Sequence, residues 1–146
     1  MLSFFPLSIM QIIEQNHILH LTGSRYLEIH TPESNWDFMI GVDAEKETAA
    51  RIIAEDPIGI QDITSSYGIP RTHAPIILCI NIHRDLSVNL QILSRRLCKQ
   101  KIEAQCLIKN MLKNGFKYPV ERDNKTKVWA WAMNEAALKA CKTPIK

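Results

Sequence analysis

Four polar side chains in the C-terminal third of the sequence recur at helical spacing and are suited to recognising an anionic polymer. They are Gln100, Lys101, Gln105 and Lys109. If residues 101–113 form a helix, these side chains lie opposite an apolar stripe. The stripe consists of Ala104, Leu107, Ile108 and Met111, which are spaced i, i+3, i+4 and i+7. A Gln amide can pair with adenine and a Lys ammonium with guanine, so the chemistry we expect is the reading of base edges in the DNA major groove.

Further basic residues flank this expected helix and are candidates for contact with the nucleic-acid backbone. Lys and Arg side chains that neutralise phosphates release counterions, which favours binding to any sequence. Such contacts also fix the register of a protein on a duplex. The candidates are Arg95, Arg96, Lys99, Lys117, Arg122, Lys125 and Lys127.

The charge of the chain is divided unevenly between its halves. Residues 1–70 contain three bases and ten acids, whereas residues 71–146 contain fifteen bases and five acids. This asymmetry predicts that the second half binds a polyanion such as duplex DNA. The alternative is a solvated basic face, or one that docks an acidic protein partner.

Short β-prone runs predict that the chain begins with strands. Residues 17–21 and 25–30 are expected strands, and residues 22–24 are the expected tight connection of a β-hairpin. Residues 37–42 form a third expected strand. We therefore expect a β-hairpin in the N-terminal portion of the chain.

A helix is expected after these strands. Asp43 is the expected N-cap, and Asp56-Pro57 is the expected end. The apolar stripe of this helix comprises Ala49, Ala50, Ile52 and Ile53. Residues 1–57 are thus predicted to form an acidic β-hairpin-plus-helix portion, which could serve in dimerisation, partner binding or ligand sensing.

The remaining residues, 58–146, are predicted to form a basic domain with four main helices and one hairpin. Pro75 is well placed in the first turn of a helix that reaches Ile82 or His83. Asn114-Gly115 should end the 101–113 helix, with Gly115 at a positive φ. The other expected elements are a helix over 90–97, a turn at 98–100, a β-hairpin over 116–133 and a terminal helix over 135–140.

This order resembles a winged helix-turn-helix domain, and residues 73–140 resemble the MarR family of DNA-binding regulators. The resemblance is carried by Leu93-Ser94-Arg95-Arg96-Leu97, by the 101–113 segment and by Gly115-Phe116. It implies an α+β winged-helix fold in which the 101–113 helix reads duplex DNA and the hairpin is a basic wing. It also implies a homodimer, because one helix and one wing read a short site.

A second stretch, residues 60–78, resembles part of the Rrf2-type regulators. The resemblance rests on Tyr67-Gly68-Ile69 followed by Arg71-Thr72-His73. It implies that a helix over 71–82, rather than 101–113, is the reading helix. Both interpretations predict DNA binding through different residues.

Other chemistry-bearing residues favour ordinary packing or surface roles. His17, His20 and His30 do not have the spacing of a metal site on one strand face, so we expect no bound metal. Cys98 and Cys106 flank the expected reading helix and are either a redox sensor or packing thiols.

The two tryptophans Trp129 and Trp131 are expected on one strand face with Met133, where they either stack on bases or cover a core.

Motifs of catalysis are missing from the sequence. It contains no nucleophile–base motif, no phosphate-binding glycine loop and no paired carboxylates in a matching context. We therefore expect a protein that is not an enzyme and uses no cofactor.

No apolar run reaches the roughly 18 residues that a membrane helix needs. The apolar N-terminus lacks the preceding bases of a secretory signal, so we expect no membrane association and a cytoplasmic location. The sequence predicts a DNA-binding transcriptional regulator, with a protein-interaction module, such as an adaptor or inhibitor, as the alternative.

Overall fold

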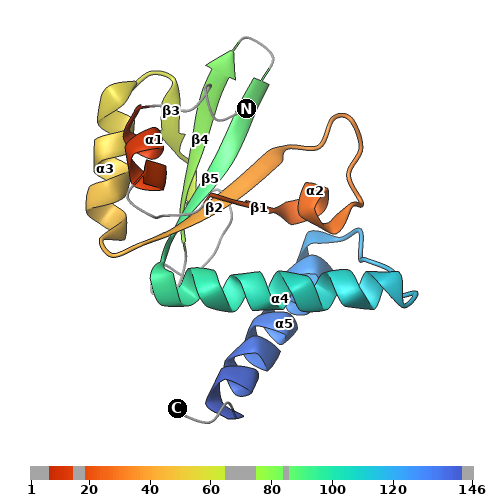
Figure 1. Ribbon diagram of the computed structural model, residues 1–146. Helices are drawn as coiled ribbons and strands as arrows, with labels where there is room; N and C mark the ends of the chain where they lie inside the picture. The colour runs from red at the N-terminus through yellow and green to blue at the C-terminus, as the bar shows by residue number, and fades with distance from the viewer. Residues whose placement is uncertain (1–6, 15–18, 65–74, 84–85, 143–146) are drawn as a thin grey trace. The chain divides into compact units, whose positions relative to one another are not determined.

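A computed structural model describes residues 7–14, 19–64, 75–83 and 86–142 (Figure 1). The elements are α1 (Leu7–Glu14), β1 (His20–Thr22), α2 (Gly23–Leu27), β2 (Trp36–Val42), α3 (Glu45–Glu55), β3 (Ile60–Asp62), β4 (Ile76–His83), β5 (Leu86–Ser94), α4 (Arg95–Lys113) and α5 (Arg122–Lys142). Helices and one five-stranded sheet together confirm the expected α+β class.

The chain divides into two compact units, residues 1–96 and residues 97–146. The boundary expected from the sequence lies earlier, between residues 57 and 58. The structural boundary lies later because β3, β4 and β5 belong to the same sheet as β1 and β2.

The five strands of the first unit lie in the order β1-β2-β5-β4-β3. β2 and β5 are parallel, in a register that runs from Trp36 beside Val88 to Val42 beside Ser94. The other three pairings are antiparallel. β2 and β5 therefore end at the same edge of the sheet. Asp43, which follows β2, and Arg95, which follows β5, both lie at this edge.

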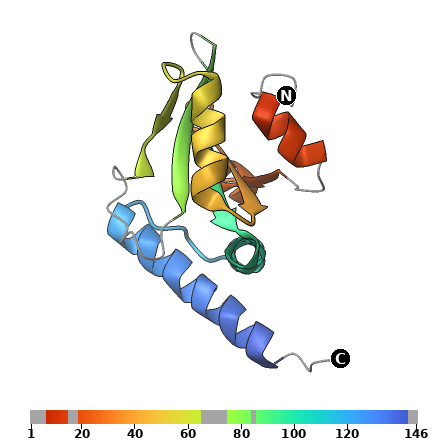
Figure 2. The ribbon, with the colours of Figure 1, turned by 90° about the vertical axis from the view of Figure 1, so that its left-hand side faces the viewer.

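The core of the first unit lies between the sheet and α3. Alternate residues of the central strands, such as Ile40 and Ile92, are fully buried and contact the same apolar cluster as Ile52 of α3. β-branched side chains dominate these positions because they fit a pleated surface. Figure 2 shows α3 across one face of the sheet with α1 beside it, and Ile9 of α1 joins the cluster.

The expected N-terminal hairpin is wrong, whereas the expected third strand and the helix after it are confirmed. Thr22 ends β1, and Gly23, at φ +70°, turns the chain into α2 instead of a second strand. A Cβ at Gly23 would lie 2.5 Å from the Asp37 carboxylate, so glycine is required here for space and for φ. α2 is held by Leu27, which is buried. Tertiary burial therefore overrides the β-propensity of residues 25–30.

The expected helix over 75–82 is also wrong, and so is the expected helix over 90–97 for all but its last three residues, which begin α4. Residues 76–83 form β4, and residues 86–94 form β5. An apolar run of this length fits a buried strand as well as a helix, and its β-branched residues favour the strand. The sheet decides the outcome, because β5 pairs with both β2 and β4 along most of its length.

The expected helix over 101–113 is confirmed, but its start is earlier and the expected turn at 98–100 is wrong. α4 begins at Arg95, directly after β5, and runs through residues 98–100 without interruption. Its end is as expected, with Gly115 at φ +96°. The N–H of Phe116 donates to the Met111 carbonyl at 3.0 Å, and that of Gly115 to the Leu112 carbonyl at 3.2 Å. These two bonds form a Schellman cap.

The expected hairpin over 116–133, and with it the wing, is wrong. Residues 116–121 are irregular, and residues 122–142 form α5, which absorbs the expected terminal helix. Ala132 and Ala136, spaced four residues apart, are buried, which is the helical pattern. Trp129 and Trp131 therefore do not share a strand face.

The second candidate reading helix, 71–82, lies partly outside the described residues. Residues 65–74, which include Tyr67 and Arg71–His73, are not described. On either side, Ile60–Asp62 and Ile76–His83 are strands. The expected 71–82 helix is therefore wrong for residues 76–82, which lie in β4.

Candidate nucleic-acid interface

One side of α4 is exposed and carries most of the exposed polar side chains of the helix. Its exposed residues recur at three- and four-residue spacing along all 19 residues of the helix. We call this set the α4 face, and it consists of Arg96, Lys99, Glu103, Cys106, Asn110 and Lys113. It contains three bases and one acid.

The single acid of the α4 face has a basic partner. A Glu103 carboxylate oxygen lies 3.2 Å from the Lys139 Nζ of α5. This exposed pair offsets the negative charge of Glu103, so the α4 face presents a net positive potential to an approaching anion.

The four residues expected to read bases lie away from the exposed side. Gln105 is 3% exposed. Gln100 is half-buried and donates from Nε2 to the Met133 carbonyl of α5 at 2.8 Å. The Lys101 Nζ lies 5.3 Å from the centre of the Trp129 ring, a cation–π contact. Lys109 is half-buried. The expected helix is present, but its expected reading side is not its exposed side.

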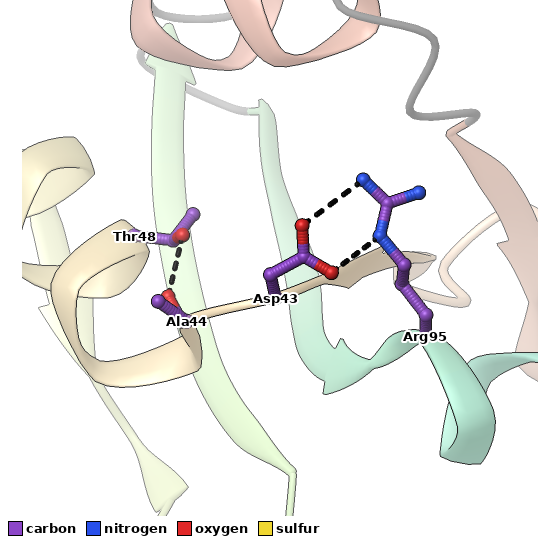
Figure 3. Close-up of polar contacts among 4 residues, drawn as sticks. All are labelled: Asp43, Ala44, Thr48 and Arg95. Atoms are coloured by element: carbon purple, nitrogen blue, oxygen red, sulfur yellow. Dashed lines mark hydrogen bonds and ion pairs between the residues drawn. The ribbon is translucent and has the colours of Figure 1, made fainter.

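Arg95 forms an ion pair at the first turn of α4. Its Nε lies 2.7 Å from Oδ1 of Asp43, and its Nη2 lies 3.4 Å from Oδ2, so the guanidinium meets the carboxylate side-on (Figure 3). Both side chains are largely exposed. A base in the first turn of a helix is disfavoured by the helix dipole, and the Asp43 carboxylate offsets the charge of Arg95 there.

Asp43 is therefore not the N-cap of α3, which corrects the sequence expectation. The N-cap is Ala44, without a side-chain cap bond. Thr48 instead donates from Oγ1 to the Ala44 carbonyl at 2.7 Å (Figure 3). The two parallel strands bring Asp43 and Arg95 to the same edge of the sheet, where the two side chains form their ion pair.

The remaining expected phosphate contacts are exposed. Arg96 and Lys99 lie on the α4 face. Lys117 is exposed in the connection between the two helices, and the exposed residues Arg122, Lys125 and Lys127 lie in the first two turns of α5.

The connection between α4 and α5 is anchored by aromatic residues. Trp129 donates from Nε1 to the Tyr118 hydroxyl at 2.8 Å. Burial raises the pKa of Tyr118, and the bond from Trp129 partly offsets that shift. Tyr118 therefore remains protonated at neutral pH and holds the connection against α5.

Three residues of the α4 face are not among the candidates that the sequence predicts: Glu103, Asn110 and Lys113. Asn110 lies seven residues, about two turns, after Glu103, and Lys113 lies seven after Cys106. The signal was the spacing of the exposed residues themselves, 99, 103, 106, 110 and 113. A helix that is expected to begin at residue 101 does not reveal this spacing, because α4 begins six residues earlier, at Arg95.

The two cysteines around the helix have different environments. Cys98 is buried, and burial raises the pKa of its thiol, with Lys101 partly offsetting that shift. A protonated, buried thiol is a packing group and a poor redox sensor. Cys106 is exposed on the α4 face.

Among the described residues, no group of three or more His, Cys, Asp or Glu side chains is arranged to hold a metal ion. His20 is half-buried in β1, and burial lowers its pKa. His30 is exposed, and His17 lies outside the described residues.

Charge is concentrated in the second unit. Residues 97–146 contain eleven bases and four acids, a net charge of +7, whereas residues 1–96 contain seven bases and eleven acids. No helix in the described part of the chain has the length and apolar character to cross a membrane. Comparison of the chain with protein-family models, curated proteins and solved structures found no match.

Proposed function

We propose that this protein is a DNA-binding protein without enzymatic activity, which contacts duplex DNA through the helices of residues 97–146. The observation that carries the proposal is the net charge of +7 on this unit, together with the three exposed bases of the α4 face. Counterion release by Lys and Arg is the main source of affinity for duplex DNA.

The dimensions of α4 support contact with the major groove. A helix about 10–12 Å across fits the groove of B-DNA, and α4 has 19 residues. Lys99 and Lys113 lie near opposite ends of the α4 face and would contact phosphates. Asn110 lies between them and carries an amide that can pair with adenine.

As a transcriptional regulator, the protein would also prefer a particular DNA sequence and would act in the cytoplasm. Cytoplasmic proteins keep their thiols reduced, and Cys79, Cys98 and Cys106 are free thiols. Duplex DNA remains the proposed partner, and the α4 face takes the place of the expected wing and reading residues.

Selection from a randomised duplex DNA pool at physiological salt tests this function. The native chain is compared with a Lys99→Gln/Lys113→Gln variant, with each of its single variants, and with Lys46→Gln on exposed Lys46 of α3, which matches the single variants in charge. We expect one motif to be enriched by the native chain and by Lys46→Gln, and lost with the double variant. Binding without enrichment would reduce the function to non-specific DNA binding, and no binding would overturn it.

The second candidate function is a protein-interaction module. Trp131 and Leu138 of α5 are 44% and 45% exposed and lie seven residues apart, so both are on the same side of the helix. A chain that fails to bind DNA, yet binds a protein in a manner lost with Trp131→Ala, would support this candidate.

A further inference from the structure

The exposed side of α5 carries a different kind of surface from the α4 face. Five exposed residues lie within a narrow band along the helix, each three or four residues from the next along the chain. We call this set the α5 stripe, and it consists of Asn124, Lys127, Trp131, Glu135 and Leu138. The stripe contains one base, one acid and two large apolar side chains.

Lys127 and Glu135 are placed symmetrically about Trp131. Lys127 lies four residues before Trp131, and Glu135 lies four residues after it. Each is about one turn from the tryptophan on the same side of the helix. The α5 stripe therefore has a positive end, an apolar centre and a negative end.

We propose that α5 joins two copies of this chain, packed antiparallel with Trp131 of one copy opposite Trp131 of the other. In that register each Lys127 faces the Glu135 of the other copy, on both sides of the two-fold axis. Asn124 faces Leu138 at the ends of the contact. A two-fold interface uses the same patch on both copies and must be complementary to itself, which this charge order achieves.

Other occupants fit the stripe less well. A nucleic-acid strand would meet the Glu135 carboxylate, and so would an acidic protein. A parallel pairing of α5 would bring Lys127 to Lys127 and Glu135 to Glu135, and like charges at an interface disfavour the complex. The antiparallel copy alone offers an opposite charge to both residues and apolar surface to Trp131.

The dimer does not depend on DNA binding, although it would give a DNA-binding protein two half-sites. The contact involves few side chains, so it belongs with small, weak interfaces. We expect a dissociation constant in the micromolar range, on the order of 10–100 μM.

Analytical ultracentrifugation of the full chain without DNA, over a wide concentration range, tests the proposal by charge reversal. Lys127→Glu alone leaves four acids at the interface, and Glu135→Lys alone leaves four bases. We expect each to weaken association roughly tenfold or more, because two attractions become two repulsions. The double reversal Lys127→Glu/Glu135→Lys restores the attraction and should return association to the native level.

Mixing the two single variants provides the sharpest result. One copy then carries only acids at these positions and the other only bases, so the mixture should associate more tightly than either variant alone. Lys46→Glu is the control for net charge and should associate as the native chain does. Circular dichroism of each variant checks that α5 is intact.

Three results would overturn the proposal. They are a native chain that is monomeric at every concentration, native association that neither single reversal weakens, and a double reversal that fails to restore association. An association lost with Trp131→Ala but insensitive to the reversals would place Trp131 in a self-contact of another register, and this too would contradict the proposed pairing. Because the measurement contains no DNA, its failure leaves the proposed function standing.

Discussion

Gly115 carries the chain out of α4 in a conformation that other residues resist. Its φ of +96° allows the two hydrogen bonds that close the helix, and a Cβ built there would meet nothing within 4 Å. Replacement of this glycine therefore tests backbone conformation without a steric clash. This position was also correctly predicted, because Asn-Gly after an apolar stripe is a strong local signal of a helix end.

Gly115→Ala is expected to destabilise the helical unit by about 1–2 kcal/mol, which is the cost of a left-handed conformation for an L-residue. Gly115→Asn should cost less, because Asn adopts that conformation more readily. Urea unfolding followed by circular dichroism measures both. Equal stability of the alanine variant and the native chain would show that the turn is not formed as described.

His20 links the stability of the first unit to pH. Burial lowers its pKa in the folded chain below the ordinary value of 6.5, so the unfolded chain binds a proton first on acidification. Stability from this residue is present above pH 6.5 and is lost as the pH falls toward the lowered folded pKa. We expect His20→Gln to reduce the loss of stability on acidification, as measured by urea unfolding across the acidic range.

The exposed His30 supplies the matched control. His30→Gln should leave the pH dependence close to native. A His20→Gln variant with the full native loss of stability on acidification would contradict the assigned environment of His20.

At the scale of elements, the sequence was informative where local signals agreed. β2 and α3 were predicted within a few residues, because a β-prone run and an apolar helical stripe were each bounded by turn residues. The sequence does not predict β5 or α5, because the apolar patterns of these segments fit both the two-residue period of a strand and the 3.6-residue period of a helix. Residues 128–133 alternate small and large side chains, as a strand does, yet Ala132 and Ala136 bury one helical side. Only the packing of the folded chain separates these possibilities.

The candidate site was predictable in part for the same reason. The basic helix over 101–113 could be located from its apolar stripe and its glycine stop. Its exposed side could not, because the packing of the folded chain buries Gln105, which the sequence pattern places among the polar residues of the helix. Gln is mostly an exposed residue, so the spacing of residues along the helix gives no sign that Gln105 is buried by tertiary packing.

The parallel pair β2 and β5 is the centre of the first unit. Ile92 on β5 is fully buried in the main apolar cluster, whereas Ile53 of α3 is only partly buried against it. Ile92→Ala should destabilise the chain by about 2–5 kcal/mol, because it removes buried methyl groups and leaves a cavity.

Urea unfolding of Ile92→Ala beside Ile53→Ala provides the comparison, and we expect a clearly smaller loss for Ile53. A loss at Ile92 no greater than that at Ile53 would contradict the central position of β5 in the sheet.

For the whole molecule, the division of charge is the feature that bears most on function. A net charge of +7 on residues 97–146 adjoins an acidic unit of residues 1–96 within one chain. The acidic unit disfavours non-specific contact with nucleic acid over its own surface, because like charges repel. Binding to DNA is therefore expected to be confined to the basic unit and to weaken steeply with added salt.

The salt dependence of binding to a defined DNA duplex tests this central claim most directly. The native chain, Lys99→Gln/Lys113→Gln and the control Lys46→Gln are titrated at several salt concentrations. We predict a steep fall in affinity with salt for the native chain. For the double variant the slope of log K against log salt should be shallower by about two, because each lost phosphate contact removes about 0.9. Lys46→Gln should match the native chain. Absence of duplex binding by the native chain, or an unchanged slope in the double variant, would contradict the account.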